Sequence, residues 1–249
     1  MGQLDGRVAV VTGGSKGIGY SSALRFAEEG AHVYITGRGK AELDEAVARI
    51  GVRATGVQGD VTDLADLDRL FATVGADGRR IDVLFANAGG TTFAPLADVT
   101  EEDYEYGTGL NLRSALFTVQ KALPLLNDNA SVILATSTTG ARGAAGVGLY
   151  AAAKAAVRSL ARTWANELRH RGIRVNALAP GATRTPALAA ATPEGVTPEE
   201  FGAMVAAPVP LGRTAEPEEQ AAAALFLASD ESSYITGIEL HVDGGINQI

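Results

Sequence analysis

The order of two kinds of segment along the chain constrains its fold more than any other feature. Short runs of β-branched and apolar residues alternate with longer stretches of helical pattern along all 249 residues. This alternation is typical of a mostly parallel sheet with helices on both faces. The runs expected to be strands are nearly all apolar, as in strands buried on both sides: RVAVVT, HVYIT, RATGVQ, IDVLFA, SVILAT, IRVNAL and IELHV.

The spacing of these runs leaves no gap for a domain boundary. We therefore predict one α/β domain over residues 1–249, a doubly wound parallel sheet of about seven strands. Residues 185–213 are the least regular segment, because prolines interrupt every helical pattern there. The segment follows the run IRVNAL, and open α/β sheets bind their ligands at the carboxyl ends of the strands. We predict that residues 185–213 form a substrate lid within the domain.

Charge and composition exclude several classes of partner. The net charge of −8 opposes binding to nucleic acid or to an anionic membrane. The chain contains no cysteine, which removes disulfides, thiolate metal sites and cysteine nucleophiles, and we expect no metal. The stretch MGQLDGRVAVVTGG is too short and acidic for a signal peptide, and no apolar run reaches the ~18 to 20 residues of a membrane span. We expect a cytoplasmic protein.

A glycine-rich loop follows the first expected strand. Gly13, Gly17 and Gly19 lie between that strand and a helical pattern, in the spacing Gly-x3-Gly-x-Gly. Glycine permits a tight turn and lets the backbone approach a pyrophosphate without a Cβ in the way. The helix that follows presents free N–H groups and the positive end of its dipole to an anion. The loop therefore predicts a nucleotide-binding site.

This loop and further motifs in the same order resemble the short-chain dehydrogenase/reductase family over essentially the whole chain. The motifs are Asp60-Val61, Asn87-Ala88-Gly89, Asn111 in LNLRS, Ser137, Tyr150-Ala-Ala-Ala-Lys154 and Pro180-Gly181-Ala-Thr-Arg-Thr185. The resemblance implies a Rossmann-type fold and a dinucleotide cofactor. It also implies these cofactor-binding residues: Gly13, Ser15, Lys16, Gly17, Ile18, Gly19, Gly37, Arg38, Asp60, Val61, Asn87, Ala88, Gly89, Tyr150, Lys154, Pro180, Gly181, Thr183 and Thr185.

Tyr150 and Lys154 are four residues apart, so on a helix their side chains lie on one face. A unit charge ~4 Å away at an effective dielectric constant of ~20 contributes ~4 kcal/mol, or ~3 pKa units, toward the phenolate. We expect Lys154 to lower the pKa of Tyr150, which acts as general acid and base. Ser137 ends a buried strand, where its hydroxyl can orient a substrate oxygen. By resemblance, Asn111 holds a water that links Lys154 to solvent.

The predicted reaction interconverts a ketone and a secondary alcohol. The segments FTVQKALPLL and KAAVRSLARTW are similar to those of bacterial alcohol dehydrogenases and carbonyl reductases that act on bulky hydrophobic ketones. The small-molecule substrate is expected to be hydrophobic, because the lid carries Leu188, Phe201, Met204 and Val205. The alternatives are a 3-oxoacyl thioester reductase and a non-catalytic dinucleotide sensor. A serine hydrolase is disfavoured, because Ser137 lies outside any Gly-x-Ser-x-Gly elbow.

NADP(H) is the expected cofactor. In NAD-selective members an acidic side chain follows the second strand, whereas here Gly37 and then Arg38 occupy this place. Arg38 can meet a 2′-phosphate with a planar set of donors, and Lys16 adds a second positive charge. The resemblance further implies a homotetramer. Residues 150–171 form an alanine-rich helical pattern that includes Trp164, and small residues let helices approach closely.

Overall fold

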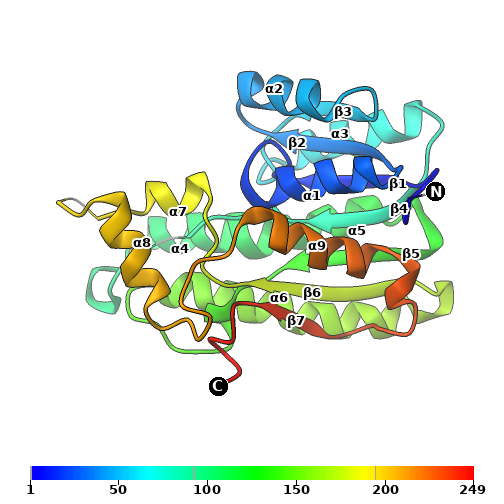
Figure 1. The fold of residues 1–249 in the computed structure, drawn as a ribbon. Coiled ribbons are helices and arrows are strands. Elements are labelled where there is room, and N and C mark those ends of the chain that lie inside the picture. The colour runs from blue at the N-terminus through cyan, green and yellow to red at the C-terminus, as the bar shows by residue number, and fades with distance from the viewer. Residues whose placement is uncertain (1, 92, 194) are drawn as a thin grey trace.

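Seven parallel strands form one continuous sheet at the centre of the computed structural model, which describes residues 2–91, 93–193 and 195–249 (Figure 1). Their order across the sheet is β3-β2-β1-β4-β5-β6-β7, and each neighbouring pair is parallel. The predicted fold class is confirmed. The strands are β1 (Val8–Thr12), β2 (His32–Gly37), β3 (Ala54–Gln58), β4 (Ile81–Ala86), β5 (Leu126–Ala135), β6 (Arg174–Pro180) and β7 (Glu239–Val242).

Helices cover both faces of the sheet. On one face lie α1 (Gly17–Glu28), α2 (Lys40–Ile50) and α9 (Pro217–Ala228). On the other face lie α3 (Leu64–Ala76), α5 (Ser114–Ala122) and α6 (Gly148–Glu167). The short helices α4 (Glu101–Thr108), α7 (Pro186–Ala190) and α8 (Pro198–Ala206) lie at one end of the sheet (Figure 1). The structure is therefore the three-layer arrangement that the strand and helix order predicts.

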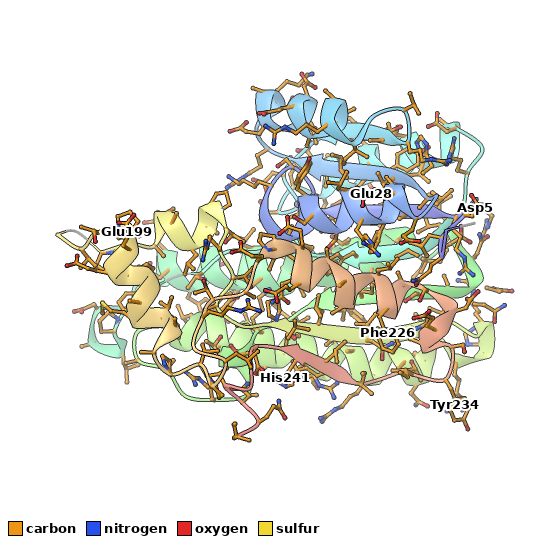
Figure 2. The ribbon with its side chains drawn as sticks, viewed as in Figure 1. Asp5, Glu28, Glu199, Phe226, Tyr234 and His241 are labelled. Atoms are coloured by element: carbon orange, nitrogen blue, oxygen red, sulfur yellow. The ribbon has the colours of Figure 1, made fainter. Side chains whose placement is uncertain are left out.

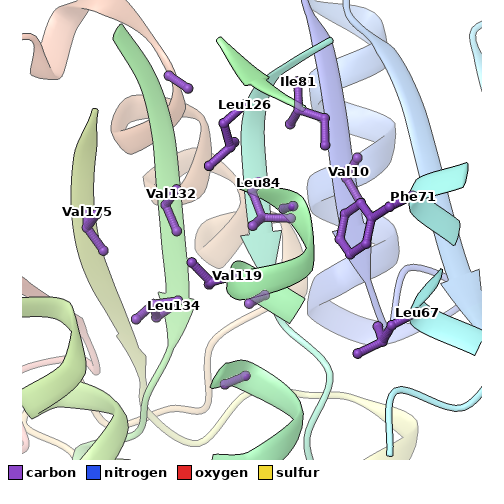
Figure 3. Packing of buried hydrophobic residues seen from close by; sticks show 14 of the residues in the cluster. Val10, Leu67, Phe71, Ile81, Leu84, Val119, Leu126, Val132, Leu134 and Val175 are labelled. Atoms are coloured by element: carbon purple, nitrogen blue, oxygen red, sulfur yellow. The ribbon is translucent and has the colours of Figure 1, made fainter. Parts of the chain in front are cut away.

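The apolar strands form the middle of two hydrophobic layers. Figure 3 shows the layer beneath α3 and α5, in which Phe71 and Leu67 pack near Val10 and Leu84 of the sheet. The opposite layer is built around Phe26 of α1. Because the central strands are buried on both sides, their carboxyl ends have little freedom to move, and the residues that follow them are held in place.

The chain reverses its direction of winding at β1. From β1 it proceeds outward to β2 and β3, and then returns to place β4 on the other side of β1. The connections after β1 and β4 therefore diverge and leave a crevice at the carboxyl edge, where α/β folds bind ligands. The glycine loop follows β1 and the Asn87-Ala88-Gly89 turn follows β4, so both predicted motifs lie at this crevice.

Two local features differ from a simple reading of the sequence. Strand β5 begins at Leu126 instead of Ser131, because Leu126 is fully buried and pairs with Ile81. The glycines of residues 107–110, GTGL, do not interrupt the helical run before Asn111, although α4 itself ends at Thr108. Residues Gly109–Arg113 form a π-helical turn between α4 and α5, a local widening that occurs often at functional sites.

The predicted lid contains two short helices, α7 and α8, each starting with a proline at its first turn. Neither helix contains a fully buried residue, so the segment packs loosely against the rest of the domain. Figure 2 shows Glu199 on α8, well away from the sheet. Among the described residues, no helix is both long and apolar enough to cross a membrane. Whether residues 185–213 close over a substrate stays a prediction.

Candidate active site

The glycine loop after β1 is tightly closed. Gly13 and Gly17 have φ angles of +65° and +57°, in the left-handed region that favours glycine. A Cβ on Gly19 would lie 2.5 Å from Nδ2 of Asn87 and would collide with the carbonyl of Gly13. The loop thus requires glycine at these positions to bring its backbone close to the start of α1.

In the part of the chain that the structure describes, α1 begins without a side-chain cap. Lys16 is the N-cap residue and makes no side-chain cap, and the first turn carries no acidic residue. By contrast, α4 and α8 each begin with a complete capping box, built on Thr100 and Thr197. Uncapped N–H groups behind a glycine turn suit an anion such as a pyrophosphate. The loop residues therefore fit the phosphates of a dinucleotide.

Asn87, Ala88 and Gly89 connect this loop to the reacting groups. The Asn87 side chain donates to the carbonyls of Thr12 (3.0 Å) and Gly13 (3.3 Å), and the Ala88 amide donates to Oγ1 of Thr12 (3.1 Å). A Cβ on Gly89 would lie 2.8 Å from Oδ1 of Asn111 and 3.0 Å from Nζ of Lys154. The turn thus supports the phosphate loop on one side and leaves room for Asn111 and Lys154 on the other.

The residues predicted to hold the adenosine end meet at the ends of β2 and β3. A Cβ on Gly37 would lie 2.7 Å from Oγ of Ser15, so the glycine brings β2 close to the phosphate loop. Arg38 is largely exposed, and its Nη1 lies 3.9 Å from Oδ2 of Asp60. Asp60 also accepts hydrogen bonds from Thr62. Val61 is buried beside it.

The predicted cofactor-binding segment 180–185 lies against the glycine loop at Gly17. The Gly181 amide donates to the carbonyl of Val242 (3.0 Å), which fixes the start of the loop against β7. Thr183 is buried, and its hydroxyl donates to the carbonyl of Gly181 (2.9 Å). Thr185 caps α7, and a Cβ on Gly17 would lie 3.3 Å from its Cγ2. The structure therefore brings residues 180–185 to the same crevice as Gly17.

Ser137, Tyr150 and Lys154 meet at the carboxyl end of β5. Ser137 follows the strand, and its Oγ accepts hydrogen bonds from the amide (3.3 Å) and hydroxyl (3.0 Å) of Thr139. Lys154 is buried on α6, where its Nζ donates to the carbonyl of Ala135 (2.9 Å) and lies 5.6 Å from the ring centroid of Tyr150. A hydroxyl, a phenol and an ammonium group therefore converge, as the motif spacing predicts.

The electrostatics of Tyr150 differ from the expectation. Burial raises the pKa of Tyr150, while hydrogen bonding with the hydroxyls of Ser137 and Thr91 acts in the opposite direction. Burial lowers the pKa of Lys154 to about 8. In this structure, burial is the largest influence on the pKa of Tyr150, and the ammonium group of Lys154 donates to the carbonyl of Ala135.

Asn111 is buried in the π-helical turn and clamps the connection after β4. Its Oδ1 accepts from the amide of Gly90 (3.1 Å), and its Nδ2 donates to the carbonyls of Gly90 (2.9 Å) and Gly107 (3.0 Å). The Asn111 side chain therefore fixes the backbone at Gly90 and Gly107, a role that the motif did not predict. The water expected between Asn111 and Lys154 stays a prediction.

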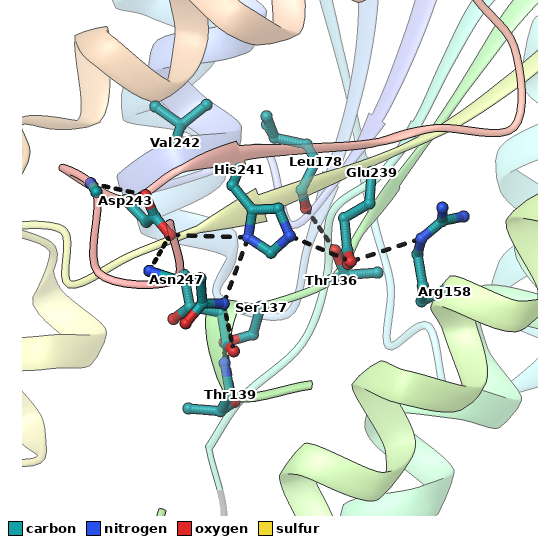
Figure 4. A network of polar contacts seen from close by, with 12 residues as sticks. Thr136, Ser137, Thr139, Arg158, Leu178, Glu239, His241, Val242, Asp243 and Asn247 are labelled. Atoms are coloured by element: carbon teal, nitrogen blue, oxygen red, sulfur yellow. Dashed lines mark hydrogen bonds and ion pairs between the residues drawn. The ribbon is translucent and has the colours of Figure 1, made fainter. Parts of the chain in front are cut away.

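Sequence reasoning missed two contributors to the site. Thr91 reaches Tyr150 from the connection after β4. Asn247, in the C-terminal tail, donates to the carbonyl of Thr138 (2.9 Å), next to Ser137 (Figure 4). The tail is in turn held by Asp243, whose carboxylate accepts a hydrogen bond from the backbone amide of Asn247 (3.2 Å). No local pattern indicates a contact between residues 109 positions apart, so only the fold reveals this support.

A chain of polar and ionisable side chains runs from α6 across β7 into the tail (Figure 4). Arg158 of α6 pairs with Glu239 (3.5 Å), which faces Nε2 of His241 (3.4 Å). Nδ1 of His241 faces Asp243 (3.7 Å) and the side-chain amide of Asn247 (3.4 Å). This chain joins α6, β7 and the tail beside Ser137. Among the residues that the structure describes, no cluster of three or more potential metal-ligating side chains occurs.

Comparisons with known proteins agree with this geometry. A family model described as enoyl-(acyl carrier protein) reductase matches residues 13–247. The chain is 45% identical to oxidoreductase asL5 of Sarocladium schorii over 99% of this chain and 98% of that protein. It is 38% identical to 3-oxoacyl-[acyl-carrier-protein] reductase FabG of Thermotoga maritima, covering 98% of this chain and 99% of that one. A solved structure of a short-chain dehydrogenase/reductase from Serratia marcescens superposes with a TM-score of 0.91 at 30% identity, covering 98% and 99% of the two chains.

Proposed function

This chain belongs to the short-chain dehydrogenase/reductase family, whose members are oxidoreductases that use nicotinamide dinucleotides, and from that premise we propose that it interconverts a ketone and a secondary alcohol with NADP(H). The observation that carries the proposal is the meeting of Ser137, Tyr150 and Lys154 beside a crevice whose glycine loop fits a pyrophosphate.

In the reductive direction, a reduced nicotinamide bound at this crevice would be the source of the hydride for the carbonyl carbon. Tyr150 donates its proton to the oxygen, and the raised pKa keeps the phenol protonated at neutral pH, which is the form that this step needs. Ser137 donates a hydrogen bond to the same oxygen and fixes its position. Lys154 holds a proton at Nζ below its pKa of about 8 and stabilises the phenolate left behind.

The substrate that we propose is small and apolar. Leu188, Phe201, Met204 and Val205 on α7 and α8 are not fully buried, so they are available to an apolar ligand. Acidic residues occupy the first turns of α4 and α8, as Glu101, Glu102, Asp103, Glu199 and Glu200. An acidic carrier protein docking over these helices would be repelled, although the similarity to FabG keeps a 3-oxoacyl thioester as the second candidate.

A substrate panel tests the proposed function. The purified protein is mixed with NADPH or NADH, and absorbance at the reduced-cofactor band is followed with aryl ketones, alkyl ketones and a 3-oxoacyl thioester. We expect NADPH consumption with apolar ketones and little with the thioester. Preferential reduction of the thioester would establish the second candidate instead. Cofactor binding without consumption on any substrate would indicate a dinucleotide sensor.

Arg38→Ala is expected to weaken NADPH binding by roughly 10- to 100-fold, if charged hydrogen bonds contribute ~1.5 to 3 kcal/mol, while NADH binding hardly changes. The reason is that the exposed guanidinium is paired only loosely with Asp60, at 3.9 Å, and can therefore turn to meet a 2′-phosphate. Lys40→Ala is the matched control, since that ammonium group already pairs with Asp44 (2.6 Å). Fluorescence titration with both cofactors measures the effect. Equal losses for NADPH and NADH would contradict the assignment.

We propose that the protein assembles as a homotetramer, and we expect sedimentation velocity at micromolar concentration to give four chains. The exposed side of α6 carries small residues, among them Ala152, Ala155 and Ser159, and small side chains allow helices of two subunits to approach closely. Trp164 lies partly exposed on the same helix. A stable monomer at this concentration would refute the proposed tetramer.

A further inference from the structure

The connection from β4 to α4 runs beside Tyr150 and is held at two points. Asn111 pairs with both backbone groups of Gly90, as donor at 2.9 Å and acceptor at 3.1 Å. Four residues later, the amide of Ala94 donates to the carbonyl of Gly146 (2.7 Å), in the segment that leads into α6. Between these points the hydroxyl of Thr91 is close enough to Tyr150 to act on its pKa. The connection is therefore attached to both segments that carry the proposed chemistry.

Phe93 lies between the two attachment points, with its ring on Gly146. A Cβ on Gly146 would lie 2.6 Å from Cε2 of Phe93, so the ring occupies the space that any larger residue would fill. Gly146 also has a φ angle of +79°, which disfavours other residues. The contact thus depends on this glycine. It supports the ring on one side only, because the Phe93 side chain stays 74% exposed.

The position of the Phe93 ring relative to Tyr150 suggests a role for this ring in substrate binding. Phe93 is two residues from Thr91, which contacts the Tyr150 phenol, and Gly146 is four residues before Tyr150 itself. We infer that Phe93 is a specificity-determining residue, whose exposed ring packs against the aromatic group of an aryl ketone bound at Tyr150. This inference rests on the proposed function and names the substrate class of the same site.

The chemistry of the connection favours an aromatic group over a charged or sugar-like one. Residues 90–97, GTTFAPLA, carry no charged side chain, and the backbone polar groups of Gly90 and Ala94 that are described above are already paired. The exposed ring of Phe93 provides apolar surface area and an electrostatic quadrupole. The quadrupole favours offset or edge-to-face packing against a second ring. An aryl ketone matches this ring, because two aromatic groups gain offset or edge-to-face packing that a ligand without a ring cannot make.

The test compares three ketones on four proteins. Acetophenone carries an aromatic ring, cyclohexyl methyl ketone has a saturated ring of similar size, and butanone has neither. The proteins are the wild type, Phe93→Ala, Phe93→Leu and the control Leu96→Ala, which truncates a neighbouring apolar side chain that is 94% exposed. We expect Phe93→Ala to lower kcat/KM for acetophenone roughly tenfold more than for butanone. Phe93→Leu should restore kcat/KM for cyclohexyl methyl ketone more fully than for acetophenone. Leu96→Ala should keep the wild-type ratios of kcat/KM among the three ketones.

Equal losses on all three ketones would overturn the inference and reduce Phe93 to a structural support for its loop. Unchanged ratios in Phe93→Ala would overturn it as well. Saturation-transfer NMR on the ring protons of acetophenone, in the presence of NADP⁺, which carries no hydride to reduce the ketone, separates this question from turnover. If the wild type reduces no ketone, the proposed function fails, yet a transfer signal that Phe93→Ala abolishes still supports the aromatic subsite. A signal that persists in Phe93→Ala would contradict it.

Discussion

Tyr150→Phe is expected to lower turnover by about 10²- to 10⁴-fold while the dissociation constant of the cofactor stays nearly the same. The substitution removes the proton that the phenol donates and changes the volume of the side chain very little. The residual rate would come from Ser137 and from the positioning of the substrate, which do not depend on the phenol oxygen. Stopped-flow turnover and fluorescence titration with NADPH measure the two quantities separately.

Tyr234→Phe is the matched control for this experiment. Tyr234 is fully exposed at the end of the molecule opposite Glu199 (Figure 2), so loss of its hydroxyl should leave turnover unchanged. Turnover of Tyr150→Phe within threefold of the wild type would exclude the phenol as proton donor. Weakened cofactor binding in Tyr150→Phe, with normal turnover at saturation, would assign the hydroxyl to binding instead.

Lys154→Met is expected to abolish nearly all activity. The same substitution is expected to raise the free energy of unfolding at pH 7 by ~2 kcal/mol. Burial lowers the pKa of Lys154 from 10.5 to about 8. This difference corresponds to ~3 kcal/mol of unfavourable free energy for the charged form in the folded state. Loss of the hydrogen bond from Nζ to the carbonyl of Ala135 offsets ~1 kcal/mol of the gain. Urea unfolding at pH 7 measures the difference in free energy of unfolding between Lys154→Met and the wild type.

The stability gain of Lys154→Met should depend on pH in a defined window. Below pH 8, Lys154 is charged in both the folded and the unfolded chain, so the full penalty is present. As the pH rises from about 8 to 10.5, the folded chain loses the proton before the unfolded chain does, and the wild type recovers stability. The difference between the two proteins should therefore shrink across this window. Lys40→Met, which removes an exposed ammonium group, is the control.

A Lys154→Met protein that is less stable than the wild type at pH 7 would contradict the burial argument. It would indicate that the lysine's packing and its hydrogen bond to Ala135 outweigh the desolvation of its charge. A gain that stays constant up to pH 10.5 would show that the ammonium group is not the cause. Activity that survives the substitution would separately contradict the proposed role of Lys154 beside Tyr150.

The amino-acid sequence by itself determined the order of the strands and helices, the place of the glycine loop and the common helix face of Tyr150 and Lys154. Each of these depends on residues that are close together in the chain: apolar runs that must be buried, glycines at a turn, and a spacing of four on a helix. Because the carboxyl ends of parallel strands meet at one edge, the order of the motifs also predicted that they would converge.

The tertiary structure alone decided what surrounds those motifs. It brought Thr91 close to Tyr150, placed the ring of Phe93 on Gly146, paired the side chain of Asn111 with backbone groups, and brought Asn247 to the end of β5. It also decided the direction of the pKa shift of Tyr150: the pKa is raised, although a lysine lies four residues away. The physical reason is that burial and contacts between distant segments arise only when whole layers pack together, and the energy of a charge depends on that packing.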